Sequence, residues 1–325
     1  MKPRTRADVL ILGDGPAGCA AAIFALQSGL SACVLGQRTT PRAHPGETLH
    51  PGVEPIFRQL GIWDDLLAQN FHRQRGVWRE DADGRRAFAP YGRDAAGEWR
   101  GFQADRARLA EIFRARVRVL GGKMLPIARL EAPLFTGAKV AGVRADGCEW
   151  RAPAVLDATG RRAWLAEQLG LKISRHGPEQ RVRFGWAADS FSELDGQPLF
   201  RLRADGWGWL APLGGGRCAW AELRRQGARG GLDFAWKIRP ECAGDGYFLL
   251  GDAACLLDPS AANGVLRACM SGIFAVHLLA AIRSGAAHPH EAAGEYRRKI
   301  TEDFFRTASE MGPGAEERGV LSVVI

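Results

Sequence analysis

The chain has 325 residues, of which 46% are hydrophobic and 25% are charged. This composition is typical of a globular protein and excludes a disordered chain, and the length is sufficient for two lobes. The net charge of +8 comes mainly from arginines scattered through every segment, with no basic run interleaved with aromatic residues, so we expect no nucleic-acid partner.

The first predicted elements are a strand, a glycine-rich turn and a helix. Residues 8–12 form a short apolar run, and the segment "CAAAIFALQSG" predicts a helix of small residues that ends at Gly29. Residues 13–18 between them have the G-x-G-x-x-G pattern of a dinucleotide-binding turn. Our candidates for cofactor contact in this turn are Gly13, Gly15, Pro16, Ala17 and Gly18. In such a turn the first glycine allows the bend, the second the approach of a pyrophosphate and the third close packing of the helix on the strand.

The second predicted strand is "SACVLGQ", residues 31–37. Dinucleotide-binding folds normally have an acidic residue near the end of this strand, which binds the ribose hydroxyls. Here the chain has Gly36 and then Gln37. Because an amide can donate or accept a hydrogen bond, Gln37 is our candidate for the ribose contact.

The later elements predict a second lobe and a return to the first. Residues 71–101 and 181–236 alternate short apolar runs with turns and hold seven of the ten tryptophans, which predicts a mixed or antiparallel sheet. Three segments, "KMLPIARLEA", "KVAGVRADG" and "CEWRAPAVLDATG", predict a meander. Residues 246–282 predict a strand, a Gly-Asp pair, a loop and a long helix, and residues 291–310 predict a final amphipathic helix.

Three motifs in this order carry a family resemblance: G-x-G-x-x-G, D-A-T-G-R at 157–161 and G-D-A-A-x-x-x-D-P at 251–259. Together they resemble the FAD-dependent group A monooxygenases and their tryptophan-halogenase and geranylgeranyl-reductase relatives. The resemblance implies an α/β fold, in which a Rossmann-like FAD-binding domain of glutathione-reductase type is interleaved with a mixed or antiparallel β-sheet substrate domain, followed by C-terminal helices. The expected FAD-binding domain is residues 1–70, 102–175 and 237–285, the substrate domain is 71–101 and 176–236, and the C-terminal helix and tail are 286–325.

The resemblance also implies roles for residues in these motifs. Asp252 would bind the ribityl chain of FAD, Pro259 would lie beside the flavin, and the helix that starts at Asn263 and Gly264 would face flavin N1 and O2. A helix N-terminus stabilises the negative charge that reduced flavin carries there. Arg106, in "QADRARLAEIF", matches the family's FAD-contacting arginine; the alternative is an ordinary arginine on a surface helix.

The segment "PGETLHP" resembles the strap that runs between the flavin and substrate pockets in halogenases, with Glu47 and Pro51 at matching positions. A carboxylate at the edge of a flavin can orient substrate or move protons, so Glu47 is a candidate catalytic residue. The alternative is that Glu47 only caps a helix or pairs with an arginine. We expect His50 to be a surface residue, as a lone histidine in a loop usually is.

The segment "WGWLAP" resembles the W-x-W-x-I-P signature of flavin-dependent tryptophan halogenases, with Ala211 in place of isoleucine. We predict that Trp207 and Trp209 form a wall of the reaction site; the alternative is plain packing. Halogenases of this type use a lysine in the substrate lobe upstream of the signature, but no lysine occurs between Lys2 and Lys123. Because arginine cannot replace lysine in that reaction, the sequence favours hydroxylation over halogenation.

The closest resemblance is to flavoproteins that mature cysteine tryptophylquinone enzymes by hydroxylating a protein-bound tryptophan. It implies an FAD-dependent monooxygenase that hydroxylates an indole-type ring through a C4a-hydroperoxyflavin, with NAD(P)H as the reductant. The expected substrate is an aromatic group, a peptidyl tryptophan in quinone cofactor maturation being the specific hypothesis. The alternatives are a halogenase-like or geranylgeranyl-reductase-like enzyme on a small molecule, and a non-catalytic flavin-holding partner protein.

Other features predict the setting of the protein. Seven cysteines without a C-x-x-C pair are expected to be reduced core thiols of a cytoplasmic protein. The seven histidines have no metal-like spacing, so we expect no metal site. No signal peptide precedes the first strand, and the apolar stretch 271–282 is short for a bilayer, so we expect no transmembrane segment.

Overall fold

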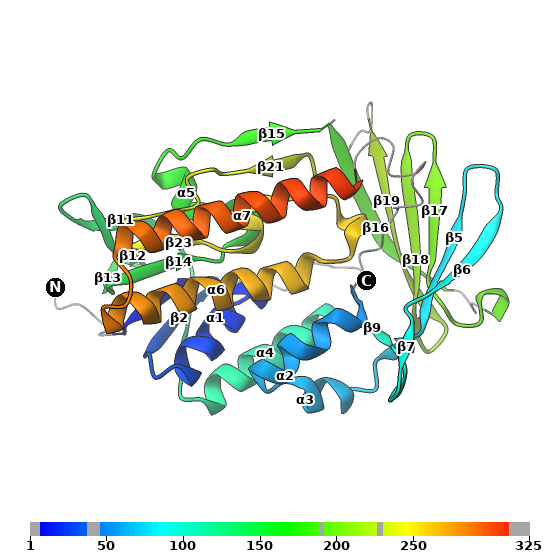
Figure 1. Ribbon diagram of the computed structural model, residues 1–325, viewed down its shortest axis with the longest axis horizontal. Helices are drawn as coiled ribbons and strands as arrows, with labels where there is room; N and C mark the ends of the chain where they lie inside the picture. Colours follow the sequence, from blue (N-terminus) through cyan, green and yellow to red (C-terminus); the bar gives the residue numbers. More distant parts are fainter. Residues whose placement is uncertain (1–6, 38–45, 178, 189–191, 226–229, 312–325) are drawn as a thin grey trace.

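The structure is a computed structural model that describes residues 7–37, 46–177, 179–188, 192–225 and 230–311. Two regions lie next to each other along its longest axis (Figure 1). One contains a parallel sheet with helices packed against it, and the other is built around a tall sheet of long strands.

Six strands form the central sheet of the first region, in the order β10-β2-β1-β14-β23-β22. Neighbouring strands are parallel, except that β22 is antiparallel to β23. Their bounds are β10 (Lys123–Ile127), β2 (Ala32–Gln37), β1 (Val9–Leu12), β14 (Ala154–Asp157), β23 (Tyr247–Leu249) and β22 (Ala243–Gly244). Every residue of β1, β14 and β23 is buried, as expected for central strands of a parallel sheet covered on both faces.

A separate antiparallel meander consists of β11 (Leu130–Thr136), β12 (Lys139–Ala145) and β13 (Cys148–Arg151). The expectation that the meander also includes the segment "KMLPI" was wrong. That segment is β10, which pairs in parallel with β2 at the edge of the central sheet. A short apolar run has the same appearance in either sheet, so its partner could not be read from its residues.

Helices pack against the central sheet and against one another. α1 (Pro16–Gln27) contacts both α4 (Arg106–Val119) and α6 (Gly264–Ser284). Shorter helical segments connect the strands: α2 (Glu54–Leu60), α3 (Trp63–Leu67), α5 (Trp164–Gln168), η1 (Pro51–Val53), η2 (Gly160–Arg162), η3 (Ser192–Leu194), η4 (Gly251–Ala253) and η5 (Pro259–Ala261).

By length and composition, α6 is the one described helix that could cross a membrane. It continues the apolar stretch 271–282 back to Gly264 and is 21 residues long, so the expectation of a stretch too short to span a bilayer was wrong. However, α6 packs closely on α1, because a Cβ on Gly272 would fall 2.6 Å from the carbonyl oxygen of Ala17. Such close contact is typical of a core helix, and a cytoplasmic location remains a prediction.

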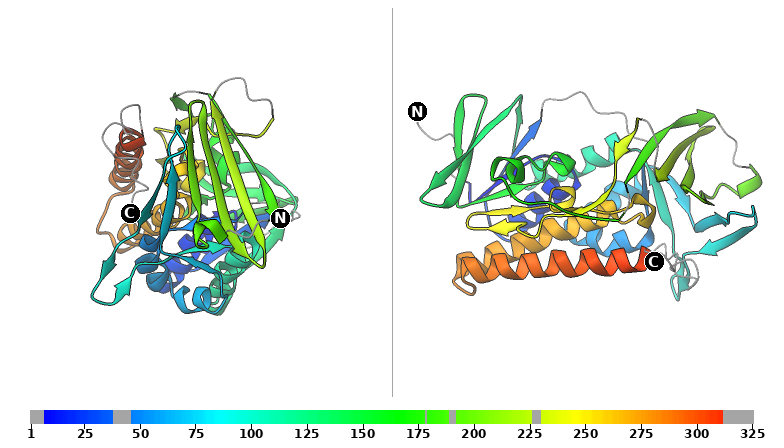
Figure 2. Two further views of the ribbon diagram at one scale, coloured as in Figure 1. Left: turned by 90° about the vertical axis from the view of Figure 1, so that its right-hand side faces the viewer. Right: turned by 90° about the horizontal axis from the view of Figure 1, so that it is seen from above.

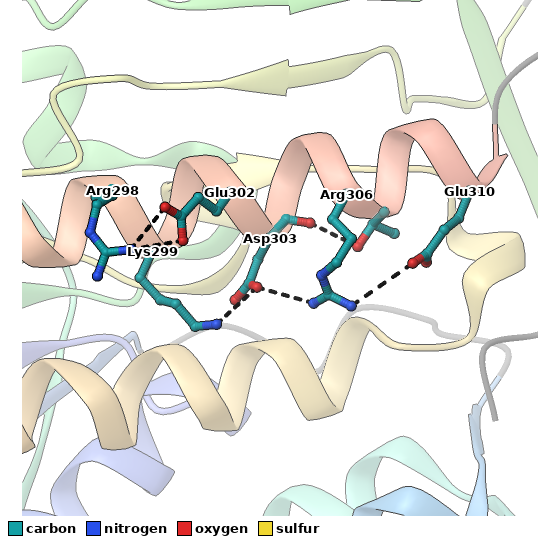
Figure 3. A network of polar contacts seen from close by, with 7 residues as sticks. Arg298, Lys299, Glu302, Asp303, Arg306 and Glu310 are labelled. Atoms are coloured by element: carbon teal, nitrogen blue, oxygen red, sulfur yellow. Dashed lines mark hydrogen bonds and ion pairs between the residues drawn. The ribbon is translucent and has the colours of Figure 1, made fainter.

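The final helix, α7 (Pro289–Met311), lies along α6 and runs parallel to the long axis of the molecule (Figures 1 and 2). Its buried positions recur at helical spacing, with Tyr296, Ile300 and Phe304 turned inward. A ladder of ion pairs spaced three or four residues apart runs along the helix (Figure 3): Arg298–Glu302, Lys299–Asp303, Arg306–Asp303 and Arg306–Glu310.

The second region contains a mixed seven-stranded sheet in the order β20-β16-β19-β18-β17-β5-β6. All its neighbours are antiparallel except β17 and β5, which are parallel. The strands are β20 (Leu232–Asp233), β16 (Gln180–Ala188), β19 (Arg217–Arg225), β18 (Gly206–Gly214), β17 (Leu199–Arg203), β5 (Gly76–Glu80) and β6 (Arg86–Pro90). With the helix-covered parallel sheet, this sheet confirms the predicted fold class.

Two three-stranded antiparallel sheets and a hairpin complete the fold. One sheet, β3-β9-β4, consists of β3 (Glu47–Leu49), β9 (Gly101–Ala104) and β4 (His72–Gln74). The other, β15-β21-β24, consists of β15 (Ser174–His176), β21 (Trp236–Ile238) and β24 (Cys255–Leu256), and the hairpin pairs β7 (Arg93–Asp94) with β8 (Gly97–Glu98). None of the seven cysteines is in a disulfide bond, and six of them are buried, which is the burial expected of core thiols.

Candidate functional site

The glycine turn connects β1 to α1, and two of its glycines are required by the backbone around them. Gly13 has φ +105°, and a Cβ there would fall 2.4 Å from the carbonyl oxygen of Ala158. A Cβ on Gly18 would fall 2.0 Å from the carbonyl oxygen of Gly13. Gly15 differs, because a Cβ there would meet nothing within 4 Å. Gly13 and Gly18 therefore shape the turn, while Gly15 borders open space.

α1 begins at Pro16 with Gly15 as its N-cap, and no side chain caps it. Its first N–H groups can therefore bind an anion in the open space before Gly15. Ala17, the next candidate residue, is buried and lies against Gly251, whose Cβ position is 3.5 Å from the Ala17 Cβ. Ala17 thus joins the glycine turn to the Gly-Asp motif by packing.

The end of β2 explains the glycine that stands before Gln37. A Cβ on Gly36 would fall 3.0 Å from Cγ of Asp14, whose carboxylate accepts a 2.8 Å hydrogen bond from Nε of Arg114. An acidic side chain does lie at this edge of the sheet, but it comes from the glycine turn. Gln37, the last residue of β2, is half-buried beside it.

Asp252, in η4, is surrounded by cations from four segments. Burial raises the pKa of this carboxyl, and four nearby positive charges oppose the shift: Arg267, Arg161, Arg106 and Lys237. A carboxylate in such a setting is held in place electrostatically, which suits a residue that binds a ligand hydroxyl. Arg161 and Arg267 were not among the sequence candidates, although Arg161 ends the D-A-T-G-R motif.

Glu47 and Arg106 form an ion pair between β3 and the first residue of α4. Burial lowers the pKa of Arg106, and the nearby Asp252 carboxylate opposes that shift. Arg106 in turn opposes the rise in the pKa of Asp252. The structure thus brings Glu47, Arg106 and Asp252 together from three distant segments. In this arrangement Glu47 has the pairing role that the sequence left as an alternative.

The two tryptophans of β18 lie on the same face of the strand, being two residues apart. Trp207 is 5% exposed, and its indole Nε1 donates a 3.0 Å hydrogen bond to Oδ1 of Asp258. The same Asp258 oxygen accepts a 2.9 Å hydrogen bond from the backbone N–H of Ser260, just after Pro259. The bond from Trp207 therefore attaches β18 to the loop that contains Pro259.

Trp209 is only partly buried and lies near the same aromatic ring as Trp207. The centroid of the Phe200 ring is 5.8 Å from that of Trp207 and 6.3 Å from that of Trp209. The three rings form an aromatic face on the seven-stranded sheet. Since the Trp207 indole N–H is occupied by Asp258, Trp209 is the tryptophan available to contact a ligand.

The loop after Asp258 leads directly into α6, whose N-cap is Asn263. The Asn263 side chain makes no capping hydrogen bond, and a Cβ on Gly264 would meet nothing within 4 Å. The start of α6, like that of α1, thus offers uncapped N–H groups beside open space. These groups fit FAD as the motifs predict. The start of α1 suits the pyrophosphate, the Asp252 carboxylate suits the ribityl chain, and the start of α6 suits the flavin ring.

The expectation for His50 was wrong, because its side chain is 3% exposed. Nδ1 of its ring accepts a 3.0 Å hydrogen bond from the N–H of Gly52, which makes His50 the N-cap of η1. The signal in the sequence was the following Pro-Gly, which allows the ring to fold back over the turn. Among the described residues, no group of three or more His, Cys, Asp or Glu side chains could hold a metal ion.

Comparison with known proteins identifies the family of the chain. Residues 6–201 match the family described as FAD binding domain. The tryptophan 2-halogenase of Chondromyces crocatus is 24% identical over 92% of this chain and 66% of its own length, so this chain spans about two thirds of that relative. The 1H-pyrrole-2-carbonyl peptidyl-carrier-protein chlorinase of Pseudomonas fluorescens is 24% identical over 79% of this chain and 72% of its own.

A solved structure shows the same fold. The myxobacterial chondrochloren halogenase CndH superposes with a TM-score of 0.82 at 20% identity, covering 93% of this chain and 81% of its own. The predicted resemblance to the monooxygenase and halogenase superfamily is therefore confirmed, while closeness to the tryptophylquinone maturases remains a prediction.

Proposed function

This chain belongs to the FAD binding domain family, and from that premise we propose that it is a flavin-dependent, halogenase-like enzyme acting on an electron-rich aromatic ring of a small molecule. The observation that carries the proposal is the Trp207–Asp258 hydrogen bond, which joins the aromatic face of β18 to the loop that leads into the uncapped start of α6. Two named halogenases that cover most of the chain support the choice of reaction.

Each part of the site would have a separate task. When bound and reduced, FAD supplies the activation of O2 for electrophilic attack on a substrate. The N–H groups at the start of α6 stabilise negative charge near Gly264, whether it is on the ring of FAD or on a halide. Trp209 and Phe200 orient a flat substrate ring and exclude water from it.

Hydroxylation is the second candidate, with a peptidyl tryptophan as one possible substrate. The observation that favours it is the absence of any lysine between Lys2 and Lys123, the part of the chain that includes β3, β4 and β9. From β3 and the start of α4 the ionisable groups that reach the site are Glu47 and Arg106, which neutralise each other. In both candidates the proposed source of electrons is NAD(P)H, directly or through a separate reductase.

The test is a product assay with and without halide. The purified chain is loaded with FAD, supplied with NADH and a flavin reductase in air, and offered an indole, a phenol and a tryptophan-containing peptide. Each reaction is run with bromide and without it, with catalase present so that free peroxide cannot halogenate the substrate. Mass spectrometry then distinguishes replacement of hydrogen by bromine from the gain of oxygen.

A brominated small aromatic product is the expected result. Oxygen gain that does not depend on bromide would establish the hydroxylase, and oxygen gain on the peptide alone would establish the maturation role. If the flavin is reoxidised and no substrate is changed, both candidates fail. A loaded protein that reduces a double bond without O2 would instead be a reductase.

A further inference from the structure

Two neighbouring rows of residues cross the seven-stranded sheet from β5 to β16, which stand side by side with β17, β18 and β19 (Figure 1). The strand register places in the first row Glu80, Arg201, Gly208, Glu222 and Arg183. It places in the second row Arg79, Phe200, Trp209, Ala221 and Phe184. Successive residues of a strand point to opposite faces, so the two rows lie on opposite faces of the sheet.

The first row pairs each of its positive charges with a carboxylate. Arg201 forms an ion pair with Glu80, and Arg183 lies 3.8 Å from Glu222. Arg86, on the neighbouring strand β6, forms a further ion pair with Glu80 at 2.6 Å. On this face of the sheet the arginines of the row are therefore bound by the chain itself.

The second row lies on the face that carries Trp207, whose indole is bonded to the loop before α6. Its one charged residue is Arg79, which stands next to Phe200 in the register. Val77, on the same face of β5, packs in one cluster with Phe200 and Trp207. Arg79 is half-buried, and among the residues that the structure describes it forms no hydrogen bond or ion pair. A single unpaired cation thus lies among the aromatic rings of the candidate site.

A half-buried guanidinium without a counter-ion is unfavourable, because it has lost part of its hydration and gained no partner. Burial lowers the pKa of Arg79, and no carboxylate of the described part of the chain opposes the shift. Arg106 differs, because Asp252 opposes the lowering of its pKa. The planar fork of a guanidinium matches a carboxylate through two parallel hydrogen bonds. A ligand carboxylate would therefore supply what the chain does not.

We propose that Arg79 binds a carboxylate of the substrate, and that the enzyme therefore acts on aromatic acids. Arg79 is two strands from Trp209, so their Cα atoms are about 10 Å apart. A flat ring that stacks on Trp209 and Phe200 would bring a carboxylate on a short side chain within reach of the guanidinium. The inference rests on the proposed function, because it names the class of substrate for the same aromatic face.

The test compares acids with their uncharged amides on the FAD-loaded protein, without a reductant, so that binding is measured and no reaction occurs. The pairs are indoleacetate with indoleacetamide and hydroxyphenylacetate with hydroxyphenylacetamide, and calorimetric titration gives the dissociation constants. Arg79→Met and Arg79→Gln remove the positive charge. Arg183→Met is the matched control, because it removes the same charge from the opposite face, where the side chain is 60% exposed. Circular dichroism shows whether each variant is folded.

We expect the wild type to bind at least one acid about tenfold or more tightly than its amide, the effect of a charge-assisted hydrogen bond. Arg79→Met and Arg79→Gln should bind that acid as weakly as the amide, with the affinity for the amide unchanged. Arg183→Met should keep the full preference for the acid, which shows that net charge alone does not cause it.

Equal binding of acid and amide by the wild type in both pairs overturns the proposal without any variant, and so does failure of both acids to bind. A preference that persists in a folded Arg79→Met or Arg79→Gln protein also overturns it, because another group would then hold the carboxylate. These outcomes are separate from failure of the proposed function. An enzyme that changes only neutral aromatic rings would keep that function and lose this inference, whereas a protein that prefers acids but changes no substrate would do the reverse.

Discussion

The indole Nε1 of Trp207 lies 3.0 Å from Oδ1 of Asp258, and this hydrogen bond joins the seven-stranded sheet to the loop before α6 across 51 positions of the chain. Both residues are 5% exposed. Burial raises the pKa of Asp258, and the hydrogen bonds from Ser260 and Trp207 oppose the shift. The bond therefore holds a buried carboxyl group and connects the two regions at the candidate site.

Trp207→Phe keeps an aromatic ring but removes the donor to Asp258. We expect the free energy of unfolding to fall by about 2 kcal/mol, because a buried carboxyl oxygen loses a hydrogen bond. Trp209→Phe, on the same face of β18, is the control and should cost less than about 1 kcal/mol because its side chain is partly exposed. Urea unfolding of the apoproteins measures both free energies. Equal losses in the two variants would show that the hydrogen bond to Asp258 does not stabilise the protein.

The two kinds of glycine in the turn should respond differently to alanine. Gly15→Ala should leave the apoprotein as stable as the wild type, because the new Cβ meets nothing and the φ of −76° suits alanine. It should weaken FAD binding about tenfold or more by occupying space near the pyrophosphate. Gly18→Ala should prevent stable folding, because its Cβ would overlap the Gly13 carbonyl oxygen.

Thermal melting and a fluorescence titration with FAD separate these outcomes. A destabilised Gly15→Ala apoprotein with normal FAD affinity would show that Gly15 serves the turn and not the cofactor.

Asp252→Asn should stabilise the apoprotein and weaken FAD binding. The pKa of Asp252 is raised above its ordinary value of 3.8, so the folded protein resists ionisation of this group. The protonated side chain of Asp252 therefore contributes to the free energy of unfolding. This contribution is fully present below pH 3.8 and is lost as the pH rises through the raised pKa. Asparagine cannot ionise, so the variant should gain stability relative to the wild type over that range and keep the advantage at neutral pH.

Melting temperatures of both apoproteins from about pH 4 to about pH 8 check this prediction. Asp83→Asn, at an exposed turn, is the control. A constant difference between wild type and Asp252→Asn across the range would contradict the raised pKa, and unchanged FAD affinity would contradict the ribityl contact.

The Glu47–Arg106 ion pair predicts coupling between two substitutions. Glu47→Gln and Arg106→Met should each weaken FAD binding, but the double variant should lose less than the sum, with a coupling energy of about 1 kcal/mol. The physical reason is that each single variant leaves the partner's charge half-buried without its counter-ion. A double-mutant cycle on FAD affinity measures this, and strict additivity would show that Glu47 acts independently of Arg106.

Much of the fold could be predicted because the relevant signals are local. The strand, turn and helix around Gly13, the Gly-Asp pair and the amphipathic α7 all depend on residues close together in the sequence. The place of β10 depends on contacts between distant segments, and it was predicted incorrectly, whereas α6 begins at Gly264 as predicted. Local pattern does not specify which partner an apolar run will pack against.

The site was predicted less completely than the fold, for the same reason. The Asp14–Arg114 pair joins residues 100 positions apart, and nothing near Gly36 indicates that Asp14 covers it. Burial of His50 likewise depends on its packing over Gly52 and beside Asn263. The sequence placed the two tryptophans on a strand. It could not show that Trp207 is hydrogen-bonded to Asp258, or that Trp209 is less deeply buried than Trp207.

The position of β14 in the central sheet has a consequence for biosynthesis. It pairs on one side with β1, near the N-terminus, and on the other with β23, about 90 residues further along. While the ribosome is still making the second region, β14 has one open edge, and the turn at Gly13 is present long before the carboxylate of Asp252. The unfinished chain therefore cannot hold the whole coenzyme, and loading must follow closure of a long-range strand pair that is slow to form.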